Sequence, residues 1–187
     1  MKQSARDMVM SLAVLLLILG AIVWVTQGCQ FSPNGPTVDP GSAPTVNATK
    51  ELSGAARRVR FAVRNPALPA DWRSNSATTS PVGTGNQATT AVRVGWITPG
   101  GNYVRLSQSD AARDALVVLE AGGGVRPQST GSVDISGATW TKHPAKGTEV
   151  SWVTSLDGVQ VLITGSGTED EFRTLATATQ AARPINP

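Results

Sequence analysis

Reactive side chains are scarce in this chain of 187 residues. Cys29 is its one cysteine, so no internal disulfide stabilises the fold. His143 is its one histidine, which excludes a histidine-rich metal site, and we expect its imidazole at the surface. Aromatic residues make up 5% of the chain and the formal net charge is only +3, so neither base-stacking platforms nor a strong positive field indicates a nucleic-acid partner.

Catalytic motifs are also absent from the sequence. The glycines at 122–124 and 165–167 lack the lysine and the spacing of a phosphate-binding loop, and there is no G-x-S-x-G element. Asp110 with Asp114 and the acidic run 169–171 are better explained as helix-capping residues than as a carboxylate pair for hydrolysis. We therefore expect no enzymatic activity, catalytic residue, cofactor or metal site.

The longest apolar run covers residues 8–25, where eighteen consecutive positions carry no charge. As a helix this run is about 27 Å long, close to the thickness of the hydrocarbon core of a bilayer. Lys2 and Arg6 precede it, and the next basic residue is Lys50. Because basic flanks stay on the cytoplasmic side, the sequence predicts a cytoplasmic segment 1–7, a transmembrane helix 8–26 and an exported remainder at the cell membrane.

A cleaved signal peptide is the main alternative to an anchor. Its apolar stretch is usually about 7–15 residues, shorter than the run here, and Val25-Thr26-Gln27-Gly28 is a poor cleavage site. Cys29 lies where a bacterial lipoprotein carries its lipid, although the preceding residues depart from the usual pattern. Cys29 is thus a candidate lipidation site, with a free thiol or an intermolecular disulfide as the alternatives.

The chain beyond the apolar run divides by composition. Residues 27–50 are dominated by proline, glycine, serine and threonine, which favours an extended linker because so little apolar surface can be buried. Residues 51–187 are long enough for one domain with one hydrophobic core. We expect this domain to be extracytoplasmic.

A β-hairpin is the clearest local structure in this domain. Residues 149–165 contain two strand-like segments around Asp157-Gly158, a dipeptide typical of a two-residue type I′ turn. The register that this turn imposes places Trp152 opposite Ile163 on a strongly apolar face, whereas the other face is mixed. This pattern predicts a sheet covered on one side, with Trp152 in the core.

Other segments complete the prediction of the fold. Residues 168–171 form a capping box before an amphipathic helix. Two more hairpins are predicted within residues 92–107 and 133–142, and a short helix over residues 111–120 that Asp110 caps. The expected fold class is α+β, with one N-terminal transmembrane helix followed by an antiparallel sheet and flanking helices.

Two features of this domain are candidates for partner binding. Arg57, Arg58 and Arg60, with Arg64 close by, form a basic cluster suited to anionic headgroups or envelope polymers, and a solvated surface is the alternative. Trp72 follows a turn-rich Leu-Pro-Ala-Asp segment, where an indole either anchors a partner or packs at the edge of the core.

Several stretches, taken in order, carry a family resemblance. They are RDMVMSLAVLLLILGAIV, FAVRNPALPADWRSNS, VGWITPGGNYVRLSQSD, the strand at 138–140 and GVQVLITGSGTEDEFRTLATAT. The chain thereby resembles an actinobacterial family known as domain of unknown function 4245. The resemblance implies a single-pass anchor and an exported domain, and it implies no activity, cofactor or catalytic residue.

These features predict a single-pass envelope protein whose exported domain binds or supports a cell-envelope component. Its expected partners are membrane lipid, through the N-terminal helix, and another envelope protein or polymer. Two alternatives remain open. One is a membrane-tethered hydrolase of envelope material that uses Asp110 or Asp134 beside another carboxylate, and the other is a lateral partner of another membrane protein.

Overall fold

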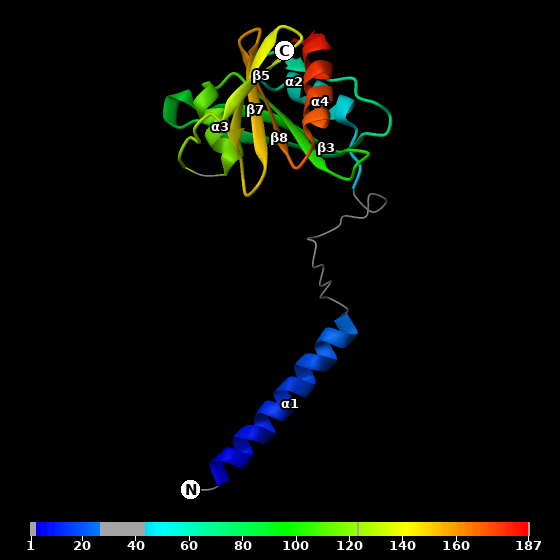
Figure 1. Ribbon diagram of the computed structural model, residues 1–187, viewed down its shortest axis with the longest axis vertical. Helices are drawn as coiled ribbons and strands as arrows, with labels where there is room; N and C mark the ends of the chain where they lie inside the picture. The colour runs from blue at the N-terminus through cyan, green and yellow to red at the C-terminus, as the bar shows by residue number, and fades with distance from the viewer. Residues whose placement is uncertain (1–2, 27–43, 123, 187) are drawn as a thin grey trace. The chain divides into compact units, whose positions relative to one another are not determined.

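The computed structural model describes residues 3–26, 44–122 and 124–186 (Figure 1). Side chains are described for these residues except 3–5, 7, 20, 22–26 and 87. The chain divides into two units, one containing helix α1 and the other the α+β domain.

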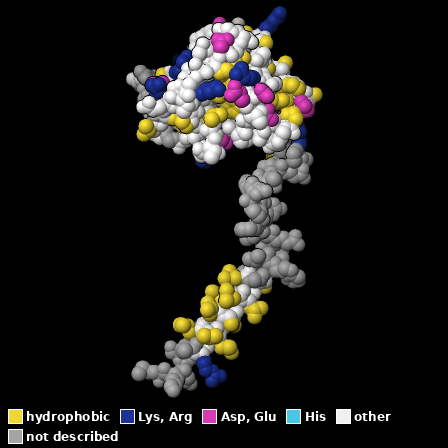
Figure 2. Space-filling view, in the orientation of Figure 1, with side chains coloured by type: hydrophobic (Ala, Val, Ile, Leu, Met, Phe, Trp, Pro, Cys, Tyr) yellow, Lys and Arg dark blue, Asp and Glu magenta, His cyan; other side chains and the backbone are white. Residues whose placement is uncertain are grey.

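Helix α1 (Gln3–Thr26) contains the apolar run of the sequence. Its large apolar side chains from Met8 to Leu19 are each between 50% and 74% exposed, and Figure 2 shows hydrophobic side chains along this described part of the helix. Among the residues that the structure describes, no helix combines the length and the apolar character needed to cross a membrane.

The α+β domain is built on antiparallel strands. Its elements in chain order are α2 (Ala48–Ala56), β1 (Val63–Arg64), β2 (Arg73–Val82), η1 (Gly85–Gln87), β3 (Thr89–Ile97), β4 (Tyr103–Ser109), α3 (Arg113–Ala121), β5 (Gly131–Ile135), β6 (Ala138–Pro144), β7 (Val150–Leu156), β8 (Val159–Gly165), α4 (Glu169–Ala181) and β9 (Pro184–Ile185). Seven strands form one sheet in the order β2-β3-β4-β8-β7-β6-β5, and β1 pairs with β9. The predicted α+β class with an antiparallel sheet is confirmed.

The hairpin β7–β8 has the predicted turn and register. Asp157 and Gly158 both have positive φ angles, 51° and 82°, as a type I′ turn requires. Trp152 lies opposite Ile163, as the sequence indicates. The hairpins predicted within residues 92–107 and 133–142 are also present, as β3–β4 and β5–β6.

Helix α4 begins with the predicted capping box. The amide of Glu171 donates to the hydroxyl of Thr168, and the amide of Thr168 donates to Glu171 Oε2 at 2.7 Å. Phe172 and Leu175 on this helix are fully buried, and the Phe172 ring packs on Trp152 with 5.2 Å between ring centroids. The apolar face of the β7–β8 hairpin is therefore covered by α4.

Helices cover both faces of the sheet, so the prediction of a sheet covered on one side was wrong. In Figure 1, α2 and α4 lie on one side of the sheet and α3 on the other. Leu116 and Val117 of α3 pack with Val153 and Leu162 of the hairpin's mixed face. That face carries enough apolar side chains to hold a short helix, which accounts for the second layer.

The start of α3 also differs from the prediction. Ala112 stands at the N-cap without a side-chain hydrogen bond, whereas Asp110 accepts a hydrogen bond from the hydroxyl of Thr89. Asp110 is therefore engaged with the neighbouring strand rather than with the helix. The helix is capped at its C-terminal end by Gly122, whose φ of 69° places it in the left-handed region.

Helix α2 was not predicted from the sequence. Asn47 caps it, because its side-chain oxygen accepts from the amide of Lys50 at 2.9 Å. The first turn of α2 overlaps the end of the predicted linker 27–50. Residues 27–43 of that linker lie outside the described residues.

Candidate functional site

A polar groove of about 620 Å³ lies where three connections of the domain meet. It is lined by residues 58–60 after α2, residues 86 and 88–90 at the start of β3, and residues 110–112 before α3. Two of the predicted partner-binding residues, Arg58 and Arg60, are part of this lining. We call this hollow the arginine groove.

Hydrogen bonds between β3 and the end of β4 shape one wall of the arginine groove. The hydroxyl of Ser109 donates to the carbonyl of Thr90 at 2.9 Å and accepts from the amide of Ala111 at 3.1 Å. Thr89 donates to Asp110 Oδ1 one residue further out. These bonds fix the chain where Asp110 enters the lining.

The opposite wall follows directly from the end of α2. The amide of Arg58 donates to the carbonyl of Ala55 and closes the last turn, and Phe61 is buried in the main core. Three arginines lie in the chain between Ala55 and Phe61. Arg57, Arg58 and Arg60 are exposed because the chain around them is anchored by apolar residues on either side.

Within the part of the chain that the structure describes, these three arginines have no carboxylate partner in an ion pair. Among the residues that the structure describes, ion pairs join Asp or Glu to Arg64, Arg93, Arg105, Arg126, Lys142 and Arg173. None of these pairs includes Arg57, Arg58 or Arg60. Asp110 is the acidic residue of the groove's lining, which it shares with two arginines, Arg58 and Arg60.

A smaller hollow of about 160 Å³ is also lined by Arg58. Glu51 of α2 and the exposed Thr78 and Thr79 of β2 contribute to its lining. Arg58 thus contributes to two neighbouring hollows, and the arginine groove is the larger of them.

Arg64 separates from the predicted basic cluster. It is buried, it forms an ion pair with Asp157, and it donates to the carbonyls of Gln180 and Ala182 at the end of α4. Its own backbone is held by Gln108, which accepts from its amide at 2.7 Å. Arg64 therefore stabilises the contact between β1 and the C-terminal segment.

Trp72 lies just before β2 and is half-buried against the main core. Its amide donates to the carbonyl of Pro69 at 3.0 Å, which closes the turn that the sequence indicates. Partner binding through Trp72 stays a prediction, as does lipidation of Cys29, which lies outside the described residues.

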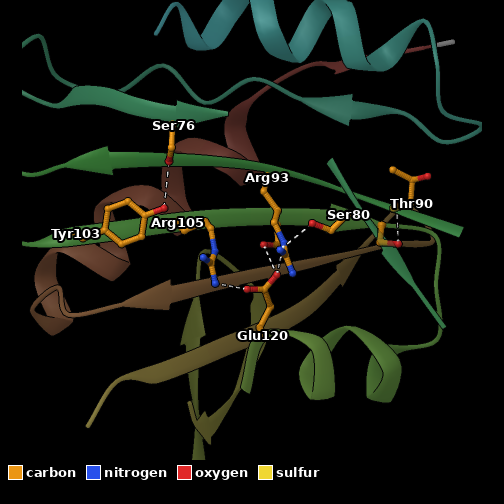
Figure 3. A network of polar contacts seen from close by, with 9 residues as sticks. Ser76, Ser80, Thr90, Arg93, Tyr103, Arg105 and Glu120 are labelled. Atoms are coloured by element: carbon orange, nitrogen blue, oxygen red, sulfur yellow. Dashed lines mark hydrogen bonds and ion pairs between the residues drawn. The ribbon is translucent and has the colours of Figure 1, made fainter. Parts of the chain in front are cut away.

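A buried ion-pair network centred on Glu120 of α3 was not predicted from the sequence (Figure 3). The side chain of Glu120 is fully buried, with Arg93 Nε 2.7 Å from its Oε1 and Arg105 paired with its Oε2. Ser107 also donates to Oε1 at 2.8 Å, and Arg93 donates to Ser80 at 2.9 Å. The guanidinium groups of Arg93 and Arg105 are therefore paired with a carboxylate within the fold, whereas the ion pairs of the described residues include none of the groove arginines.

Two further titratable side chains from the sequence analysis, His143 and Glu169, are engaged within the fold. His143 is only 2% exposed, so its predicted surface position was wrong; its Nδ1 lies 3.1 Å from the carbonyl of Pro127, which explains how a polar ring is accommodated there. Hydrogen bonds from Arg173 and Lys142 lower the pKa of Glu169, consistent with a role in surface ion pairs. Among the described residues, no group of His, Cys, Asp or Glu side chains could hold a metal ion.

Comparison with protein families gives a match over most of the chain. The model of a family described as a protein of unknown function, DUF4245, matches residues 1–179. The chain belongs to this family. The DUF4245 match includes α1, the arginine groove and most of α4, and it confirms the family predicted from the sequence. No curated protein and no solved structure matches the chain significantly.

Proposed function

We propose that this DUF4245 protein is a single-pass membrane protein whose exported α+β domain binds a component of the cell envelope through the arginine groove. In this proposal the N-terminus stays in the cytoplasm and α1 is the anchor. The domain acts as a binding module, and its partner is an envelope component that carries negative charge.

The sequence and the exposure of α1 support the anchor. Residues 8–25 carry no charge, and the large apolar side chains of α1 from Met8 to Leu19 are all at least half exposed. Exposure of large apolar side chains to water is unfavourable. Insertion of the helix into a lipid bilayer would remove these side chains from water. The basic residues Lys2 and Arg6 on the N-terminal side favour a cytoplasmic N-terminus.

The observation that carries the binding proposal is the excess of positive charge in the lining of the arginine groove. Arg58 and Arg60 line a polar hollow and have no carboxylate partner among the described residues, whereas Arg93 and Arg105 are paired within the fold. Guanidinium groups bind carboxylates and phosphates through paired hydrogen bonds. An anionic partner would supply the charge that the fold does not.

Isolation of the full chain from membranes of its own cells in a mild detergent tests this function. The groove variant Arg58→Gln/Arg60→Gln is compared with Lys146→Gln/Arg183→Gln, which removes the same charge from exposed positions outside the groove. We expect a stoichiometric component to accompany the wild type and the control but not the groove variant. Equal recovery of that component with the groove variant would contradict the proposal.

A further inference from the structure

We infer that the arginine groove accepts the phosphodiester headgroup of an anionic phospholipid. This inference rests on the proposed function, because it names the chemistry of the component that the same groove binds. Such a headgroup has one negative charge on phosphorus and, in a glycerol ester, hydroxyl groups that donate hydrogen bonds. The groove contains side chains that can bind the phosphate and side chains that can bind the hydroxyl groups.

The arginines provide the counterpart of the phosphate. A guanidinium group presents several N–H donors in a plane, which suits two oxygens on one phosphorus atom. Basic residues at the end of α2 also complement the helix dipole, which accounts for Arg57 and Arg58 on structural grounds. Arg60 lies beyond the helix end, where the dipole no longer favours it, and it still lines the groove.

Asp110 provides the counterpart of the hydroxyl groups. Its Oδ1 accepts from Thr89, while Oδ2 has no hydrogen-bond donor among the described residues. This carboxylate lowers the net positive charge of the lining, which limits the advantage of a phosphate dianion over a diester with a single charge. It also accepts hydrogen bonds from a ligand that carries hydroxyl groups beside its phosphate. The larger diester can engage the arginines with its phosphate and Asp110 with its hydroxyl groups at once, so we expect the groove to bind it more tightly than inorganic phosphate.

The length of the chain before the groove favours a lipid as the source of this phosphodiester. Helix α1 ends at Thr26 and α2 begins at Ala48. The intervening residues can extend over about 70 Å at about 3.3 Å per residue, and the groove begins within two residues of the end of α2. A domain tethered in this way stays within reach of the headgroups, where their local concentration is high.

Titration of the full chain in dodecyl maltoside micelles, which contain no phosphate, tests the inference. The probes are glycerophosphoglycerol, inorganic phosphate and glycerol at pH 7, and dissociation constants are measured by calorimetry. We expect glycerophosphoglycerol to bind more tightly than inorganic phosphate, and glycerol not to bind. Arg58→Gln/Arg60→Gln should weaken glycerophosphoglycerol binding by about tenfold or more, because charged hydrogen bonds are lost.

Two further variants sharpen the test. The control Lys146→Gln/Arg183→Gln should leave the dissociation constant within about twofold, since these exposed charges are not part of the groove's lining and are screened by salt. Asp110→Asn should tighten the binding of inorganic phosphate and reduce the preference for the diester. Thermal unfolding of each variant, followed by circular dichroism, establishes that it is folded.

Three results would overturn the inference: no binding of glycerophosphoglycerol, equal weakening in the groove and control variants, or inorganic phosphate binding as tightly as the diester. The last result would make the groove a site for free phosphate. If the groove variant loses the co-purifying envelope component but still binds glycerophosphoglycerol, the headgroup inference fails and the proposed function stands. If the headgroup binds as expected and no component co-purifies, the lipid itself is the partner.

Discussion

At the scale of single residues, Glu120 is the side chain whose loss should affect stability most. It is fully buried and joins α3 to β3 and β4 through Arg93 and Arg105. Glu120→Gln removes the negative charge and leaves two largely buried guanidinium groups without a counterion. We expect the free energy of unfolding to fall by about 3–5 kcal/mol, as when one partner of a buried ion pair is removed.

Urea unfolding of the full chain in detergent measures this loss for Glu120→Gln. Glu149→Gln is the matched control, because Glu149 has no ion pair among the described residues, and its effect should be about 0.5 kcal/mol or less. A Glu120 variant as stable as this control would contradict the importance of the network.

Gly165 at the end of β8 is a second position where the fold leaves no room for a side chain. Its φ is 144°, and a Cβ atom there would lie 2.1 Å from the backbone oxygen of Tyr103. Gly165→Ala should therefore displace β4 from β8 and lower the free energy of unfolding by about 2 kcal/mol or more. Gly124→Ala is the control, since nothing lies near its Cβ position. Equal midpoints of urea unfolding for the two variants would show that β4 and β8 adjust without cost.

Some single-residue roles could be predicted from the sequence and others could not. The turn at Asp157-Gly158 depends only on neighbouring residues, and its geometry is as predicted. Asp110 depends on Thr89, a residue 21 positions away on another strand, so a local pattern assigned it to the wrong partner. Glu120 likewise occupies a helical position where the sequence gives no sign of two arginines beneath it.

At the scale of elements, Glu171 connects the start of α4 to the β3–β4 turn. Burial of this carboxyl group raises its pKa, but hydrogen bonds from Thr98, Thr168 and Asn102 outweigh burial and lower the pKa below its ordinary value of 4.5. The ionised form is therefore the one that stabilises the fold. Its contribution is complete above pH 4.5 and is lost as the pH falls through the lowered pKa.

Urea midpoints of the wild type and Glu171→Gln between neutral and acidic pH test this connection. The variant should be less stable by about 1 kcal/mol at neutral pH, because it loses a charged cap. Its disadvantage should shrink as the pH falls below 4.5, where the wild type loses the same charge. A constant difference at all pH values would show that ionisation of Glu171 does not stabilise α4.

Elements with strong apolar patterns were predicted, and polar ones were missed. Strands β3, β4, β7 and β8 alternate or carry apolar runs, and helix α4 has both a capping box and an apolar stripe. Strand β2 is an edge strand of mainly serine, threonine and asparagine, so no alternation marks it. Helix α2 is only nine residues long and is stabilised by packing of Leu52 and two alanines, which no local pattern reveals.

At the scale of the whole molecule, the candidate site was predicted in part. The sequence indicates Arg57, Arg58 and Arg60 as a basic cluster, and two of them line the groove. It cannot show that Arg64 is withdrawn into the fold or that Asp110 joins the lining, because both depend on contacts between segments far apart in the chain. The charge pattern of the sequence therefore identified two arginines of the lining, but it predicted neither the shape of the groove nor the contribution of Asp110.

Protease treatment of intact cells tests the central claim, that α1 anchors an exported domain, most directly. The full chain is expressed with an epitope tag at either end, and external protease is added before membranes are separated from the soluble fraction. We expect the C-terminal tag to be digested, the N-terminal tag to survive and the chain to sediment with membranes, because basic residues keep the N-terminus inside. A protected C-terminal tag, or a chain recovered in the soluble fraction, would contradict the claim.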